Sequence, residues 1–298
     1  MSKLRPYMMP IAMAIGILFY PFLARLSALT PVLIFLMLFL TYNNIDLREM
    51  RISWLHFWLL VVQIAGCLVG YWLLRHVNQT VAQTTLICLL APTATAAPVI
   101  AAMLGGNIAC LAAYSLLSNL AVACLAPFIF SLVGVHQDIS FMESFLLILR
   151  QVSVMLLSPF AAALVIRAIS SKAQKFIAKQ SYISFYLWVI ALIVVTARTV
   201  GFIMAQDSRE HHTELLVALT AGVICVGQFF AGRRIGRRYG NTVAGGQGLG
   251  QKNTILAIWM AQTYLDPISS VGPGAYVLWQ NIVNSWQLWR QKNRLTDN

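Results

Sequence analysis

The stretch Ala244–Met260 reads AGGQGLGQKNTILAIWM, and it decides how the rest of the chain is interpreted. Its first half contains four glycines, which make a weak helix, and its second half is a continuous apolar run. Lys252 stands at the junction, and no Asp or Glu falls in the interior of any run apolar enough to cross a membrane. A charge at membrane depth is costly and marks a substrate or ion pathway. We therefore expect Lys252 to be functional.

The chain as a whole has the composition of a membrane protein. It has 298 residues, of which 59% are hydrophobic and 10% charged, with a mean hydropathy of +0.74. Runs close to the ~20 residues that a helix needs to cross a bilayer predict an all-α protein with ten transmembrane helices. We place these spans at about 8–27, 30–44, 54–74, 80–104, 108–134, 150–168, 183–205, 213–232, 242–264 and 270–289.

The basic residues that give the chain its net charge of +12 are distributed unevenly between the two sides of the membrane. With a cytoplasmic N-terminus, fifteen Lys and Arg lie on the inner side, and four (Arg25, Arg75, Arg150 and Arg209) lie on the outer side. This bias predicts a multi-pass protein of the inner (plasma) membrane with both termini in the cytoplasm. The partner is then the lipid bilayer, and no nucleic acid is expected.

Ten spans divide into two five-span halves, residues 1–140 and 141–298. Because five is odd, the second half is inverted relative to the first, which is a recurring plan of transporters with discontinuous helices. The fourth span of each half is interrupted, by Pro92 and Pro98 in the first half and by the glycines before Lys252 in the second. Non-helical backbone at an interruption persists at membrane depth only when it is buried in protein or lines a water-filled cavity.

Setting Ala97–Ala102 against Lys252–Ala257 superposes the two interruptions. A proline in one membrane helix is commonly only a kink, and glycines commonly serve close helix packing. Interruptions at matching positions beside a buried lysine favour a pair of crossing helices.

Four segments of the chain resemble the bile acid:sodium symporter family, in its bacterial ten-helix members. Leu90–Asn107 and Gly248–Ala257 look like the two crossing helices of the family, and Trp279–Ile282 resembles its Trp-His-Asn-Ile. Gln63 falls where the family has a glutamine that reaches the second sodium ion. The resemblance covers almost the whole chain, although each motif is short. It implies a core domain of spans 3–5 and 8–10, a panel domain of spans 1–2 and 6–7, and a substrate cleft between them.

The resemblance also implies two sodium sites, and here this chain departs from the family. The family's serine and asparagine on the first crossing helix correspond to Ala97 and Pro98, and its serine on span 5 corresponds to Leu111. The nearby threonine corresponds to Ser115, the shared glutamate to Gly248, and the glutamine before the crossing asparagine to Lys252. Sodium, like other hard cations, prefers several oxygen ligands. We expect sodium coupling to be lost, with Lys252 replacing a bound cation.

Three roles for Lys252 remain open. It could be a permanent counter-charge for a carboxylate or sulfonate substrate. It could titrate during the cycle, because burial disfavours a charged amine, and so couple transport to protons. It could instead brace the crossing by donating hydrogen bonds to unwound carbonyl groups.

The other candidate substrate-binding residues are uncharged polar side chains near the crossing and one arginine: Thr93, Thr95, Asn253, Gln280, Asn281 and Arg198. Polar residues in membrane helices also serve as hydrogen bonds between helices. Arg198 is near the outer end of span 7, so it either snorkels to the interface or faces the substrate.

The sequence thus predicts a secondary transporter of a small organic anion that works by alternating access and is sodium-independent. We expect no catalytic residues, metal or cofactor, because no catalytic or metal-binding constellation appears. The alternatives are a cation/proton antiporter on the same fold and a non-transporting membrane sensor or enzyme.

Overall fold

The structure is a computed structural model that describes residues 8–44, 51–94, 97–133, 140–180, 182–205 and 211–296. Nearly all of these residues are helical and none of them lies in a strand, which confirms the all-α class. Among the described residues, four helices are long and apolar enough to cross a membrane, namely Tyr20–Asn43, Trp54–Leu74, Ile108–Val133 and His212–Arg238. Shorter apolar helices are Gln79–Leu90, Leu157–Ile169 and Tyr186–Gly201. The count of ten spans stays a prediction.

The chain folds into two compact units. Unit 1 comprises residues 1–45, 123–211 and 258–270, and unit 2 comprises residues 46–122, 212–257 and 271–298. The repeats 1–140 and 141–298 and the core and panel domains also stay predictions.

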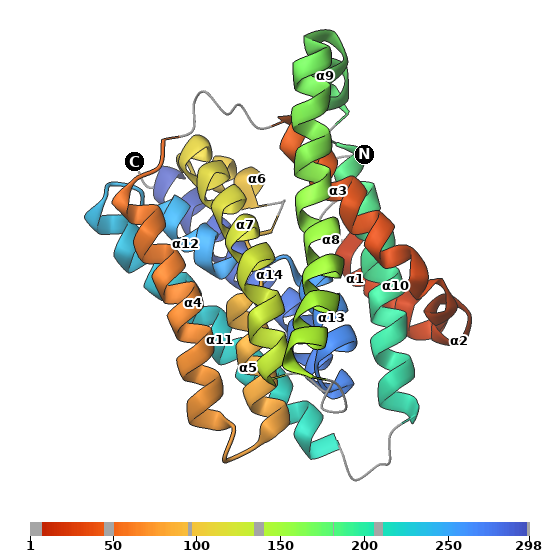
Figure 1. The fold of residues 1–298 in the computed structure, drawn as a ribbon. Helices are drawn as coiled ribbons and strands as arrows, with labels where there is room; N and C mark the ends of the chain where they lie inside the picture. Colours follow the sequence, from red (N-terminus) through yellow and green to blue (C-terminus); the bar gives the residue numbers. More distant parts are fainter. Residues whose placement is uncertain are drawn as a thin grey trace. The chain divides into compact units, whose positions relative to one another are not determined.

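Unit 1 is built on long helices that pack against one another (Figure 1). Its elements are α1 (Met8–Leu18), α2 (Tyr20–Leu23), η2 (Ala24–Leu29), α3 (Thr30–Asn44), α8 (Phe141–Ile169), α9 (Ser171–Lys179), α10 (Ile183–Ala205) and η4 (Pro267–Ser270). Helix α3 packs against α8, α9 and α10, and α1 packs against α10. The rings of Tyr42 and Phe160 meet edge to face at 5.3 Å between α3 and α8.

Two predicted boundaries in unit 1 are wrong. The break expected between spans 8–27 and 30–44 is absent, because α2, η2 and α3 follow one another directly. The chain breaks instead after Leu18, where Pro21 occupies the first turn of α2 and its missing amide hydrogen is not needed. Helix α8 also begins at Phe141, well before the expected start of span 150–168.

Unit 2 contains α4 (Trp54–Leu74), α5 (Gln79–Leu90), α6 (Ala97–Met103), α11 (His211–Arg238), α12 (Thr242–Gly250) and α14 (Val271–Thr296). Helices α7 (Ile108–Val133) and α13 (Thr254–Tyr264) begin in this unit. Helices α4 and α5 form a hairpin (Figure 1). Helices α11 and α12 approach so closely that a Cβ atom at Gly232 would overlap the backbone of Gly245. Trp279 of α14 packs against Gly222 of α11 and donates a hydrogen bond to Ala218 O at 3.0 Å.

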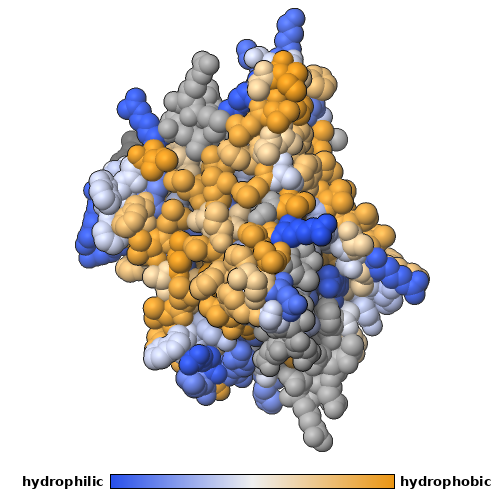
Figure 2. All heavy atoms as spheres, viewed as in Figure 1, coloured by the Kyte–Doolittle hydropathy of each residue, from blue (hydrophilic) through white to orange (hydrophobic). Residues whose placement is uncertain are grey.

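The outer face of α4 is apolar. Phe57, Leu68, Val69 and Leu73 are all exposed along it, and Figure 2 shows apolar side chains covering α4 and the neighbouring α7, with hydrophilic side chains toward the helix ends. A helix with such a face needs an apolar surrounding, so this surface fits contact with lipid.

Both predicted interruptions are present. The first lies between the end of α5 at Leu90 and the start of α6 at Ala97, and the second lies between the end of α12 at Gly250 and the start of α13 at Thr254. Pro92 lacks the amide hydrogen that would continue α5, and it disfavours helical backbone at Ala91, whose ψ angle is 134°. The glycines of α12 weaken the second helix.

Candidate functional site

The two interruptions meet inside unit 2 and pair through their backbones. Thr93 and Lys252 form an isolated antiparallel bridge. Ala94 N donates to Gln251 O at 2.9 Å, and Asn253 N donates to Pro92 O at 2.8 Å. Non-helical backbone is thereby satisfied by its counterpart, as burial of unwound segments requires.

The two bridged residues also donate side-chain hydrogen bonds in a reciprocal way. Thr93 Oγ1 donates to Gly248 O at 2.8 Å, and Lys252 Nζ donates to Leu89 O at 2.9 Å. In each case the acceptor precedes the partner by one helical turn, so the contact has a local two-fold relation. The alignment that placed Ala97 opposite Lys252 is therefore offset by one turn, because Thr93 is the residue that pairs with Lys252.

Side chains satisfy the carbonyl groups at the end of α5, which have no partner within the helix. Gln228 Nε2 donates to Cys88 O at 3.2 Å, Lys252 Nζ donates to Leu89 O, and Gln63 Nε2 donates to Leu90 O at 2.7 Å. The C-terminal end of a helix carries partial negative charge, so it favours a cation. Lys252 is the charged member of this cap.

The ammonium group of Lys252 is held in a closed environment. The residue is 2% exposed, and its backbone N donates to Gln280 Oε1 at 3.0 Å. Three thiols, of Cys67, Cys88 and Cys225, lie close enough to interact electrostatically with the amine. Within the described part of the chain, the amine thus interacts with the Leu89 carbonyl and with these three thiols.

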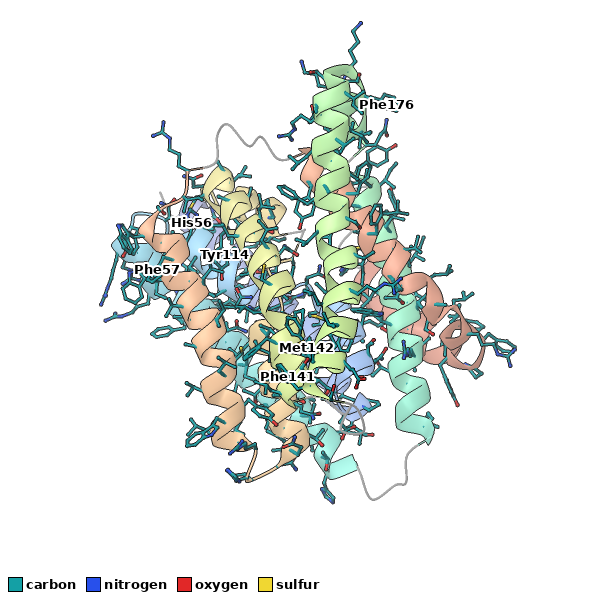
Figure 3. All side chains as sticks on the ribbon, viewed as in Figure 1. His56, Phe57, Tyr114, Phe141, Met142 and Phe176 are labelled. Atoms are coloured by element: carbon teal, nitrogen blue, oxygen red, sulfur yellow. The ribbon has the colours of Figure 1, made fainter. Side chains whose placement is uncertain are left out.

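Gln63 links the crossing to α7. Its Oε1 accepts from Tyr114 Oη at 2.8 Å and from Ser118 Oγ at 2.9 Å, while Ser118 Oγ also accepts from Thr93 N at 3.4 Å. His56 on α4 and Tyr114 on α7 face each other with stacked rings, whereas Phe57 points away (Figure 3). Both ends of the Gln63 amide are thus occupied by groups of the protein.

Neither a protein-family model nor a curated protein sequence matches this chain.

The predicted substrate-binding residues are only partly brought together. Thr93, Lys252, Asn253 and Gln280 all lie at the crossing, where Asn253 Oδ1 also caps α13 by accepting from Leu256 N at 3.2 Å. Thr95 lies outside the described residues.

The other two predicted residues, Asn281 and Arg198, lie on α14 and α10. Asn281 is half-buried on α14 and donates to Val277 O, one turn back in its own helix, at 2.6 Å. Arg198 is half-buried on α10, and it belongs to unit 1.

The positions compared with sodium ligands are mostly apolar or already bonded. Ala97 and Leu111 belong to a buried hydrophobic cluster that also includes Tyr114. A Cβ atom at Gly248 would lie 2.7 Å from the Tyr114 ring, so this site has no room for a glutamate. Ser115 is buried on α7, and Pro98 is half-buried on α6.

Sequence reasoning missed several hydroxyl and amide groups that complete the crossing. Tyr276 Oη accepts from Gln228 Nε2 at 3.0 Å and donates to Gly250 O at 2.8 Å, so it caps the end of α12. Tyr114 and Ser118 orient Gln63 in the same way. Their signal in the sequence is weak, because a tyrosine or glutamine in an apolar helix does not reveal which distant carbonyl it reaches.

Proposed function

We propose that the protein is a secondary transporter of a small organic anion that works by alternating access without sodium. The observation that carries the proposal is the hydrogen bond from Lys252 Nζ to Leu89 O, which places an ammonium group at the crossing of two interrupted helices. Crossings of this kind are where transporters bind substrates and coupling ions.

The amine takes the position that a coupling cation would otherwise occupy. It lies against the end of α5, whose carbonyl groups attract positive charge. A sodium ion would need several oxygen ligands. Gln63 Oε1 already accepts two hydrogen bonds, Gly248 O accepts one from Thr93, and a side chain at Gly248 would overlap Tyr114. These contacts support sodium-independent transport.

The charge of Lys252 supports an anionic substrate. Carbonyl and thiol groups solvate a buried ammonium only partly, because neutral dipoles do not cancel its unit charge. A carboxylate or sulfonate would cancel it. Thr93, Asn253 and Gln280, which lie within the same crossing, would orient such a group.

The proposal retains the resemblance of the sequence to the bile acid:sodium symporter family. The chain would be a divergent relative with inverted repeats, in which the ion sites are lost. Whether Lys252 keeps its charge throughout the cycle or exchanges a proton with water decides between uniport and proton coupling.

Uptake by purified protein in proteoliposomes tests the proposal. Radiolabelled carboxylates and sulfonates would be offered with sodium outside and again with choline in its place. We expect uptake of at least one anion class, unchanged by choline and abolished by Lys252→Gln. Uptake by Lys252→Gln that is intact but independent of pH would instead assign the lysine to proton coupling.

The matched control is Gln228→Leu, which removes a neutral donor from the neighbouring carbonyl of the same helix end. It should transport, because it leaves the charge in place. Uptake that stops in choline would overturn sodium independence. Unchanged uptake and unchanged pH dependence in Lys252→Gln would overturn the role of the amine.

A further inference from the structure

A basic cavity in unit 2 has a lining that includes neither Thr93 nor Lys252 of the crossing. It has a volume of about 290 Å³ and is lined by Leu104, Arg233, Val243, Trp286, Gln287, Arg290 and Gln291. Among the residues that the structure describes, the lining includes two arginines and no carboxylate. Its volume is at the lower end of the range of small-molecule sites, which fits a polar headgroup better than a large ligand.

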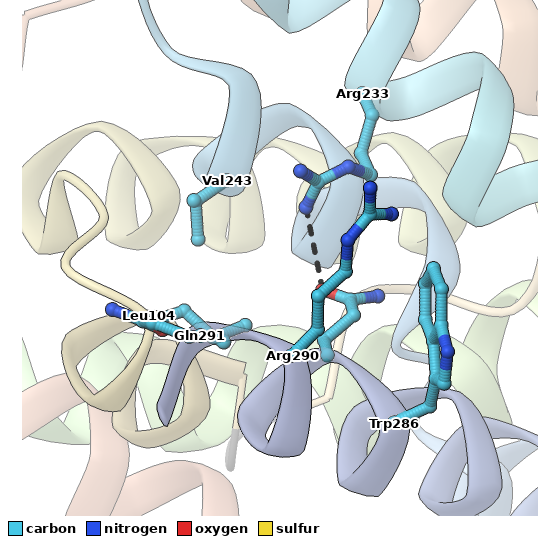
Figure 4. A pocket seen from close by; sticks show the side chains of 7 residues that line it. Leu104, Arg233, Val243, Trp286, Arg290 and Gln291 are labelled. Atoms are coloured by element: carbon cyan, nitrogen blue, oxygen red, sulfur yellow. Dashed lines mark hydrogen bonds between the residues drawn. The ribbon is translucent and has the colours of Figure 1, made fainter. Parts of the chain in front are cut away.

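The two guanidinium groups reach the cavity from different helices. Figure 4 shows Arg233 of α11 and Arg290 of α14 side by side, and its dashed line marks the hydrogen bond that Arg233 donates. Arg233 Nη1 donates to Gln287 Oε1 at 3.4 Å, and Arg290 lies over the ring of Trp286 at 5.4 Å from its centre. A guanidinium has five N–H donors in a planar fork, so each group can keep these contacts and hold an oxyanion as well.

The start of α12 adds to the positive potential of the cavity. Val243 lies in the first turn of α12. The N-cap residue of this helix, Asn241, makes no side-chain capping hydrogen bond. The N-terminus of a helix carries partial positive charge. Two arginines and a helix start around one small cavity favour an anion with several oxygens, such as a phosphate group.

An apolar stripe on α14 runs up to the cavity. Ile282, Trp286 and Trp289 are 58%, 52% and 61% exposed, and their spacing places them on one face of the helix. Trp286 belongs to both the stripe and the cavity lining. A free phosphate ion would make no contact with this apolar stripe, whereas the acyl chains of a lipid would cover it.

We propose that this cavity binds the phosphate headgroup of an anionic phospholipid, with Arg233 and Arg290 as its ligands and the acyl chains along Ile282 and Trp286. Basic pockets between membrane helices on the cytoplasmic side recognise such headgroups. The clustered basic residues of α11 and α14 are those that the positive-inside bias assigns to this side. The site is independent of the transport proposed for Lys252.

Lipid titration of the full-length protein in detergent tests the proposal. Phosphatidylglycerol would be compared with phosphatidylcholine and with water-soluble glycerol phosphate, by thermal shift and by lipid adducts in native mass spectrometry. Three proteins would be used: the wild type, Arg233→Gln/Arg290→Gln, and the control Arg237→Gln/Arg238→Gln. The control removes two exposed charges from the last turn of α11, outside the cavity lining.

We expect phosphatidylglycerol to bind and stabilise the wild type and the control. The cavity variant should bind about a hundredfold more weakly, because each charge-assisted contact contributes roughly tenfold or more. Gln preserves the stem of Arg233, which packs against Gly246. If the double variant fails to fold, the single change Arg290→Gln, on an exposed side chain, should weaken binding about tenfold.

Equal affinity of the cavity variant and the wild type would overturn the site. An equal shift with phosphatidylcholine would remove the selectivity for anionic lipid. An equal shift with glycerol phosphate at the same concentration would assign the cavity to a free phosphate compound instead of a lipid.

Discussion

Replacing each of the two bridged residues at the crossing separates the contribution of hydrogen bonding from that of charge. Thr93→Val and Lys252→Met remove the reciprocal donors to Gly248 O and Leu89 O while keeping similar side-chain volumes. A buried carbonyl left without a partner costs about 1–3 kcal/mol. Thr93→Val should therefore lower the free energy of unfolding by that amount.

Lys252→Met differs because it also removes a buried charge. Burial of an ammonium costs several kcal/mol, and it is offset here by a hydrogen bond of about 1.5–3 kcal/mol and by a helix-terminus interaction of up to about 2 kcal/mol. These terms nearly cancel. We expect Lys252→Met to change stability little or to raise it, while it abolishes anion uptake.

Thermal unfolding in detergent, followed by intrinsic fluorescence, measures both effects. A loss of 1 kcal/mol corresponds to a fall of roughly 2–4 °C in the apparent Tm of a domain of 150–250 residues. The apparent Tm of Thr93→Val should be a few degrees lower than that of the wild type, whereas the apparent Tm of Lys252→Met should not be lower. If Lys252→Met lost as much stability as Thr93→Val, Lys252 would be a structural brace. The argument that its charge serves transport would then be refuted.

Three further predictions concern packing, pH and capping. Gly232→Ala should destabilise the protein by a few kcal/mol, because its Cβ would overlap the backbone of α12. Gly227→Ala on the same helix has open space and should gain up to about 1 kcal/mol of helix propensity, so equal thermal shifts would contradict this packing. Hydrogen bonds from Ser140 N and Oγ lower the pKa of Glu143 below its ordinary value of 4.5. This capping box therefore stabilises the start of α8 above about pH 4.5 and loses that contribution as the pH falls through the lowered pKa. Hydrogen exchange in the first turn should rise on acidification in the wild type but not in Glu143→Gln, and a pH response that survives in the variant would exclude the carboxylate. Tyr276→Phe should cost about 1–3 kcal/mol, because it leaves the last carbonyl of α12 unpaired, and an unchanged Tm would argue against that bond.

Features that depend on neighbours along the chain were predicted well. The helix break after Leu90 follows from Pro92, which lacks an amide hydrogen, and the second break follows from the glycines before Gln251. Such signals act within one or two turns, so their effect is readable without a partner. The helix break expected between spans 8–27 and 30–44 was wrong. Pro31 lies in the first turn of α3, where a proline is tolerated and the chain continues without a break.

Features that depend on distant partners were not readable. Lys252 and Leu89 are 163 residues apart in the sequence, and Thr93 and Gly248 are 155 apart. An alignment of the two interruptions placed Ala97 opposite Lys252, one turn from the residue that pairs there. Register between two interrupted segments depends on which backbone groups meet, and side-chain composition does not specify that.

The amino-acid sequence by itself determined an apolar all-α chain with two interruptions and an amine beside one of them, because hydropathy and backbone preference are local properties. Only the tertiary structure decided that the amine caps the opposite helix, that tyrosine and glutamine side chains complete both helix ends, and that two arginines share a cavity. Those contacts arise from packing between helices, which brings together groups far apart in the chain.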